Sequence, residues 1–176
     1  MIDPRPLAPG EIATFLGATL ATVEAEMAAM EGRVDGWRPA LGEWCANEVV
    51  GHLIEAEQRG FAGRIRTILA EDQPKLVGWD QPAVAAARRD CDKSGPALAG
   101  EFRVLRMASI ELVNGLGPAD LDRFGLHPEV GELRIRDLLG EWVHHDRNHV
   151  RQLLANTQAR VWPQMGNAQR FSALDD

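Results

Sequence analysis

The chain has 176 residues, of which 45% are hydrophobic, and this suits one globular domain, residues 1–176, with a sizeable core. Its formal net charge is -7 and no basic cluster follows any face, so we expect no binding to nucleic acid. It has no long uninterrupted apolar segment, and the N-terminus lacks the layout of a signal peptide, so we expect no membrane span.

The first half of the chain predicts two long helices. Apolar residues recur at helical spacing over residues 10–30, and the pattern stops near Gly32. A linker with Gly36, Trp37 and Pro39 follows. The second helix is predicted over residues 43–70, where Gly60 and Gly63 lower the helix propensity and are expected to allow a close approach between helices.

The second half predicts a loop over residues 72–82 and a short helix over residues 83–91. A third long helix is expected to start after Ser94, with Pro96 in its first turn, and to end near Gly115 or Gly117. A single turn at 118–122 and an irregular segment at 125–133 precede the last helix, at about 136–158. The tail to Phe171 is expected to pack on the bundle or on a second subunit.

Four long amphipathic helices and almost no strands predict an all-α fold, a four-helix bundle. The link between the second and third helices is long for a hairpin, so we expect a crossover connection, and one path for it is over one end of the bundle. Trp79 and Asp80 lie in this link. They either face a pocket there, or Trp79 merely covers the end of the bundle.

Two histidines of the last helix, His145 and His149, are four residues apart and therefore stand about 40° apart on one helical face, with Cβ atoms roughly 6 Å apart. The spacing allows both rings to bind one metal ion. The apolar stripe runs through them, so they are expected to point inward and to need a partner. The alternative is a pair that hydrogen-bonds in the core. The neighbouring His144 shares its face with polar residues and is expected to be solvated.

The second helix supplies a third inward histidine, His52. Its stripe consists of Cys45, Val49, His52, Ala56 and Gly60. If the two helices are neighbours, three imidazoles meet, and three protein ligands with an open fourth position are typical of catalytic metal sites. A satisfied core histidine is the alternative for His52 alone. A zincin protease is excluded, because no His, Asp or Glu follows His149 until Asp175.

Two further groups have roles that the residues leave open. Cys45 and Cys91 do not form a disulfide framework and are expected to be reduced thiols in a cytoplasm, with Cys45 a buried small residue, or alternatively a ligand or nucleophile. Metal-bound imidazoles are oriented by outer acceptors. The candidates for this role are Glu48, Glu55, Glu57 and Asp146. The alternative for each of them is a solvated carboxylate on the surface.

Two strings of residues resemble the DinB-like superfamily of metal-binding four-helix bundles. Residues 44–57 read Trp-x4-Val-x2-His-Leu-x3-Glu, and residues 138–153 read Leu-Leu-x2-Trp-Val-x-His-Asp-x2-His-x2-Gln-Leu. The segments at 78–80 and 127–129 also resemble members of this superfamily. Position by position, the resemblance implies that the three metal ligands are His52, His145 and His149, the set that the helical stripes indicate.

The resemblance further implies a divalent metal, often nickel, zinc or iron, and frequently a homodimer. Members with known activity use a low-molecular-weight thiol in transfer or isomerisation, or hydrolyse amide bonds. We therefore expect metal-dependent activation of a thiol or water toward a small molecule, because a metal lowers the pKa of either. The alternatives are a non-catalytic metal-binding or stress-response protein and a structural module whose histidines only fill space. The fold does not decide between them.

Overall fold

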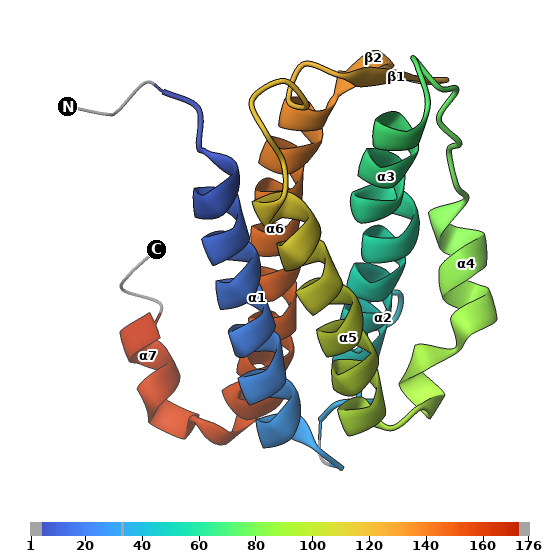
Figure 1. Cartoon of the computed structure of the whole chain (residues 1–176). Helices are drawn as coiled ribbons and strands as arrows, with labels where there is room; N and C mark the ends of the chain where they lie inside the picture. Colours follow the sequence, from blue (N-terminus) through green and yellow to red (C-terminus); the bar gives the residue numbers. More distant parts are fainter. Residues whose placement is uncertain (1–4, 33, 173–176) are drawn as a thin grey trace.

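Four helical segments form the predicted bundle (Figure 1). The computed structural model of the protein describes residues 5–32 and 34–172. The bundle helices are α1 (Pro9–Met30), the consecutive α2 (Ala46–Glu55) and α3 (Ala62–Ala70), α5 (Gly95–Asn114) and α6 (Ile135–Val161). Their apolar faces meet in two adjoining clusters of buried side chains, so the all-α four-helix expectation is confirmed.

The long connection between α3 and α5 sets the topology. Helices α3 and α5 run in the same direction, opposite to α1 and α6 (Figure 1), so the chain must return along the whole length of the bundle. Residues 71–94 make this return outside α2 and α3, and contain α4 (Gln81–Arg88) and a short 3-10 turn, η2 (Asp90–Asp92). The crossover is confirmed, but it follows the side of the bundle instead of crossing one end.

Two short strands stand where an irregular segment was expected. Strand β1 (Phe124–His127) pairs antiparallel with β2 (Gly131–Arg134) and covers one end of the bundle (Figure 1). The prediction was wrong because four residues per strand are too few to show an alternating pattern. Gly131 takes a left-handed φ of +75° at the turn, which suits glycine. Leu126 exchanges backbone hydrogen bonds with residues 74 and 76 and fastens the link to the hairpin.

The second predicted helix begins at Ala46 and is interrupted by a π-helical turn, η1 (Ala56–Gly60). The expectation that Gly60 and Gly63 allow two helices to approach is wrong. A Cβ on Gly63 would overlap the carbonyl oxygen of Gln58, so this glycine makes room for the π turn of its own helix. The close approach occurs at Gly51, where a Cβ would overlap the carboxylate of Asp90 in η2.

Helix α1 is long and apolar enough to cross a membrane by length and composition alone. Its buried residues, however, lie in both clusters of the bundle core, and a core helix of this kind passes the same test. The expectation that no segment spans a membrane therefore stays a prediction.

The two cysteines are joined in a disulfide, so the expectation of reduced thiols is wrong. Cys45 lies at the start of α2 and Cys91 in η2, with 6.3 Å between their Cα atoms. Two cysteines that are 46 residues apart in sequence carry no signal of this pairing, which depends on the return path of the link. While the bond is intact, Cys45 is neither a thiolate ligand nor a nucleophile.

Loss of this disulfide should cost stability. Cys91→Ser reopens a loop of 46 residues, and the chain-entropy model gives roughly 4 kcal/mol as the upper limit of the loss. Urea unfolding under oxidising conditions should show the wild type more stable than Cys91→Ser by up to this amount. With reductant the two proteins should be equally stable. A wild type whose unfolding free energy is unchanged by reductant would contradict the role assigned to this bond.

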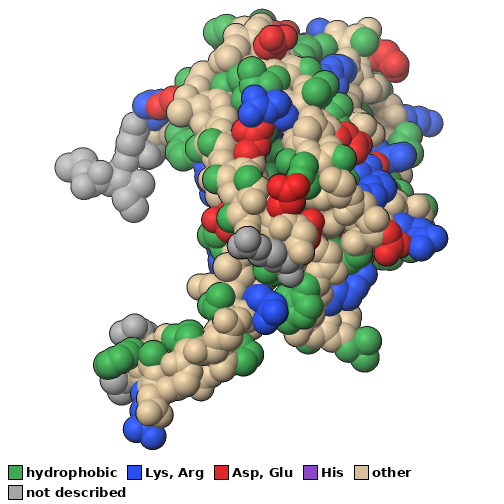
Figure 2. All heavy atoms as spheres, turned by 90° about the horizontal axis from the view of Figure 1, so that it is seen from below, with side chains coloured by type: hydrophobic (Ala, Val, Ile, Leu, Met, Phe, Trp, Pro, Cys, Tyr) green, Lys and Arg blue, Asp and Glu red, His purple; other side chains and the backbone are tan. Residues whose placement is uncertain are grey.

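The C-terminal segment leaves the bundle. After α6 the chain forms two 3-10 turns, η3 (Trp162–Gln164) and η4 (Gly166–Ala168), and the short α7 (Gln169–Ser172). This segment projects from the body (Figures 1 and 2), and the side chains of Trp162 and Phe171 are exposed. The prediction that the tail packs on its own bundle is therefore wrong. The alternative, that it packs on a second subunit, stays a prediction. On the face that Figure 2 shows, acidic and basic side chains are interspersed.

Candidate metal centre

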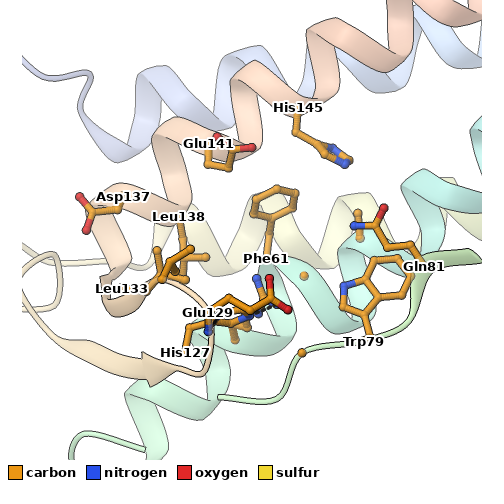
Figure 3. Close-up of a pocket in the computed structure, with 15 residues that line it drawn as sticks. Phe61, Trp79, Gln81, His127, Glu129, Leu133, Asp137, Leu138, Glu141 and His145 are labelled. Atoms are coloured by element: carbon orange, nitrogen blue, oxygen red, sulfur yellow. Dashed lines mark hydrogen bonds between the residues drawn. The ribbon is translucent and has the colours of Figure 1, made fainter. Parts of the chain in front are cut away.

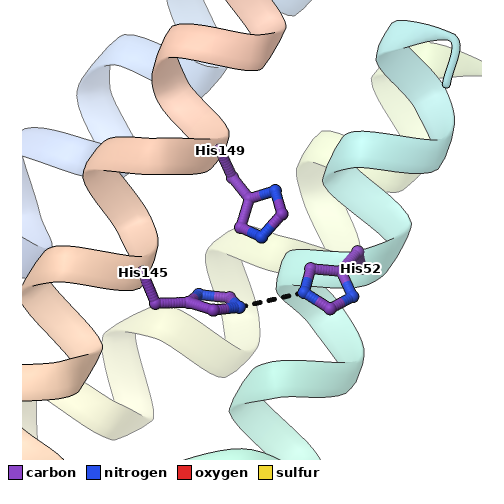
Figure 4. Close-up of side chains that lie close together, drawn as sticks. All are labelled: His52, His145 and His149. Carbon is purple, nitrogen blue, oxygen red and sulfur yellow. Dashed lines mark hydrogen bonds between the residues drawn. The ribbon is translucent and has the colours of Figure 1, made fainter. Parts of the chain in front are cut away.

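The three predicted histidines converge between α2 and α6 (Figure 4). One ring nitrogen of each of His52, His145 and His149 lies within 4.8 Å of the others. The Nε2 atoms of His52 and His145 are 2.9 Å apart, and the centroid of the His149 ring is 4.4 Å from each of the other two. The structure therefore brings together the whole set that the sequence indicates.

Helix phase explains this convergence. On α2, His52 belongs to a fully buried stripe, as predicted. On α6, His145 and His149 flank the buried line that includes Trp142 and are themselves half-buried. His144 is exposed, also as predicted. The pair thus stands at the edge of the core, where a ring is positioned by packing and still has access to a cavity.

All three rings are held neutral. Burial lowers the pKa of His52 to about 4 and that of His145 to about 3, with the neighbouring rings adding to the effect. Burial also lowers the pKa of His149, although a hydrogen bond to Gln152 opposes this. Above pH 6.5 the rings are therefore neutral, which is the form of imidazole that binds a metal.

The geometry of the rings fits a metal. Two nitrogens at 2.0–2.1 Å from one ion are separated by about 2.9 Å at a right angle and about 3.4 Å at a tetrahedral angle. The Nε2 atoms of His52 and His145 are joined by a hydrogen bond of 2.9 Å, and this separation is also compatible with the former value. Nδ1 of His149 is 3.0 Å from the amide oxygen of Gln152, so it carries the proton and leaves the lone pair on Nε2. Gln152 is an orienting residue that sequence reasoning missed, although its place one turn after His149 was visible.

Three aromatic side chains enclose the rings. Trp79 from the link stacks on His52, with 5.8 Å between the centroids and 18° between the planes. Phe61 packs edge-on against His145, and Trp44 contacts the other two histidines. Trp79 thus faces the site and does more than cover the bundle. Asp80 does not join it, because its carboxylate caps α4 by accepting from the N–H of Ala83.

None of the four candidate carboxylates is hydrogen-bonded to an imidazole among the described residues. Glu48 accepts from Arg38, and Glu55 from Arg59 and Arg88. The solvated alternative is also wrong for most of them, since Glu55, Glu57 and Asp146 are buried. The sequence does not show which carboxylate has an arginine as its partner across the bundle.

Behind the histidines lies a buried ion cluster of Glu57, Arg106, Ser109 and Asp146. Arg106 is fully buried and donates to both oxygens of Asp146, at 2.5 and 3.0 Å, while its Nη2 lies 2.5 Å from Glu57. Burial disfavours the charged guanidinium, but Asp146 and Glu57 more than offset this and raise the pKa of Arg106. Burial raises the pKa of Glu57, whose other oxygen accepts from Ser109. Asp146 adjoins His145 in sequence, so the cluster fixes α6 at the site.

A pocket of about 530 Å³ opens beside His145 (Figure 3). Its walls come from α3, α6, the hairpin and the link. Phe61 lies in the middle of the view, Trp79 and Gln81 stand on one side, and His127 and Glu129 lie at the end away from His145. A space of this size suits a small molecule. The enzyme hypothesis required such a space next to the metal, whereas a purely metal-holding site did not.

Comparison with known proteins identifies the family of this chain. The family model described as the DinB superfamily matches residues 13–153. A protein of Oceanobacillus iheyensis, named as a candidate metal-dependent hydrolase, is 22% identical over 121 residues, which are 69% of each chain. A Bacillus mycoides protein with the same description is 23% identical over 125 residues, again 69% of each chain.

A solved structure shows the same fold. YfiT from Bacillus subtilis, described as a candidate metal-dependent hydrolase with an unusual four-helix bundle topology, superposes with a TM-score of 0.78. The match covers 89% of this chain and 92% of YfiT at 17% identity. The bundle of this chain, with α3 and α5 running in the same direction, is thus found in a protein of very different sequence.

Proposed function

Because the chain belongs to the DinB superfamily, we propose that it is a metal-dependent enzyme in which His52, His145 and His149 hold a divalent metal, namely zinc, nickel or iron. The observation that carries the proposal is the meeting of three neutral imidazoles beside a pocket that His145 itself lines. When bound, such an ion would lower the pKa of water or of a thiol and so supply a nucleophile at neutral pH.

The residues of the chain bind, orient and exclude water. The three imidazoles would hold the metal, and a site with three protein ligands would leave a coordination position open for water, a thiol or a substrate. Gln152 holds the His149 ring through Nδ1, and the aromatic rings of Trp44, Phe61 and Trp79 pack against the imidazoles and reduce their contact with water. Substrate would enter through the pocket, where Phe61 and Leu138 offer apolar contact.

Hydrolysis of a small molecule is the reaction that we favour. The names of the two bacterial relatives point to metal-dependent hydrolysis. Transfer of a low-molecular-weight thiol remains the second form of the same chemistry, because the same site would activate a thiol. The alternative of a non-catalytic metal-binding or stress-response protein is less well supported, since it gives no reason for a pocket beside His145.

One experiment tests the proposal. Protein purified without chelators should contain about one divalent metal per chain by elemental analysis, and it should hydrolyse members of a panel of small amides and esters, or transfer glutathione or another small thiol to a test electrophile. Activity should vanish with a chelator and return with the metal. Protein that carries the metal but turns over no substrate, with or without thiols, would support the non-catalytic alternative.

The remaining expectations are part of the proposal. We propose a small-molecule substrate, with no nucleic-acid or membrane partner, and a homodimer in which the exposed C-terminal segment contacts a second copy. A cytoplasmic location is likewise proposed. The Cys45–Cys91 disulfide is the observation that weighs against it, because cytoplasmic thiols are normally kept reduced.

A further inference from the structure

Arg64 differs from Arg88 and Arg106, two other arginines that face the inside of the molecule. Arg88 and Arg106 are each held by two or more carboxylates. Arg64 lines the pocket, is half-buried and forms no ion pair with the residues that the structure describes. Its Nε is buried and has no hydrogen-bond partner within residues 5–32 and 34–172. A desolvated guanidinium without an anion is costly, and its flat row of N–H groups matches a carboxylate.

The contact that Arg64 does make leaves it under-satisfied. Its Nη2 lies 3.0 Å from Nε2 of His127, while Nδ1 of the same ring faces the backbone N–H of Glu129 at 3.3 Å. A neutral imidazole has one acceptor nitrogen, so the ring satisfies only one of these two donors. The guanidinium of this pocket-lining residue therefore keeps N–H donors that no described residue fully satisfies.

Arg64 and His145 of the histidine cluster lie along the same pocket. The Phe61 ring is 5.2 Å from the His145 ring, and Arg64 follows Phe61 by three residues, or roughly 4.5 Å along a helix. His127, which contacts Arg64, lies at the end of the pocket away from His145 (Figure 3). A small molecule can thus reach the histidines with one end and the guanidinium with the other.

We propose that Arg64 binds a carboxylate of the substrate while the bond to be cleaved lies at the histidines. The inference rests on the proposed function only in taking this pocket as the substrate site. A single carboxylate fits better than a phosphate, because the pocket also contains the side chains of Glu129, Asp137 and Glu141. Against one guanidinium, these make the lining net negative, and a dianion would be repelled more strongly.

The side chain of Glu129 would compete with the substrate carboxylate for the guanidinium of Arg64. Burial lowers the pKa of Arg64, and the negative charge of Glu129 partly offsets this, although Glu129 forms no direct ion pair with it. Its side chain is exposed in the turn of the hairpin, so a bound carboxylate can take the nearer position. Asp137 does not compete in this way, because it accepts from the backbone N–H of Arg134.

The test uses a matched pair of probes, 3-phenylpropionate and 3-phenylpropionamide, which differ in charge but little in shape. Isothermal titration should show that the wild type binds the acid at least about tenfold more tightly than the amide. Arg64→Gln should abolish this preference, and Glu129→Gln should raise acid affinity a few-fold. Arg66→Gln is the matched control, because Arg66 is exposed on the same helix outside the pocket.

The same titrations on metal-loaded and chelator-treated protein separate this inference from the proposed function. A preference that depends on Arg64 in both forms supports the inference. A preference that is lost with the metal but survives Arg64→Gln places the carboxylate on the metal, and overturns the inference while leaving the metal site intact. Absence of any preference in the wild type also overturns it. A protein that binds no metal but keeps the Arg64-dependent preference overturns only the proposed function.

Discussion

His149→Ala should give a folded protein that retains little or no divalent metal. The substitution removes one of three nitrogens that lie within 4.8 Å of one another, and the His149 ring is at the edge of the core, so the helices should still pack. Loss of an outer partner of a metal ligand already costs roughly 10- to 100-fold in affinity, and loss of a ligand should cost more. Elemental analysis after dialysis, with a thermal melt of the same sample, measures both effects.

His144→Ala is the matched control. His144 is on the same helix but is exposed, so its variant should bind metal as the wild type does. Metal that stays with His149→Ala would refute the ligand assignment. Metal lost from His144→Ala, and kept by His149→Ala, would mean that the helix is out of phase by one residue.

Arg106→Met should be strongly destabilising. It leaves the carboxylates of Glu57 and Asp146 buried without their cation, and breaking a buried ion pair in this way costs about 3–5 kcal/mol. For a domain of this size the melting temperature should fall by roughly 10 °C. Urea and thermal unfolding of the metal-free proteins measure the loss without any contribution from a ligand.

Arg103→Met controls for the loss of an arginine from the same helix. Arg103 pairs with Glu24 at 2.5 Å, but its side chain is 60% exposed, so its removal should cost less than about 1 kcal/mol. Equal losses from the two variants would show that the buried cluster does not stabilise the fold as described. Adding Glu57→Gln and Asp146→Asn to Arg106→Met should recover part of the loss, because the uncompensated charges are then removed.

The candidate ligands were predictable because each obeys a local rule. The helical period sets the directions of His145, His149 and His52, and only the adjacency of α2 and α6 had to be assumed. The environment of Asp146 was not predictable. It lies one residue from His145 in a polar stretch, and its burial depends on Arg106 from a third helix. The spacing of residues along one helix does not reveal which side chain of another helix forms an ion pair with them.

The features of the fold that the sequence did not predict also depend on contacts between residues that are far apart in the chain. The four bundle helices follow from long apolar stripes, but the π turn at Ala56–Gly60 is only five residues long and leaves no pattern of its own. The disulfide depends on the path of the link, which returns η2 to the start of α2. The hairpin is held partly by hydrogen bonds between Leu126 and the link, which local sequence does not reveal.

The π turn divides one long helix into two segments whose rotational settings differ. A regular helix turns about 100° per residue, so taking one residue out of Ala56–Gly60 would swing everything after it by about that angle. His52 would keep its direction, whereas Phe61 and Arg64 would turn out of the pocket. The extra residue of the π turn thus sets the direction of His52 and the directions of Phe61 and Arg64 independently, so the lining of the pocket can change in one segment without moving the histidine of the other.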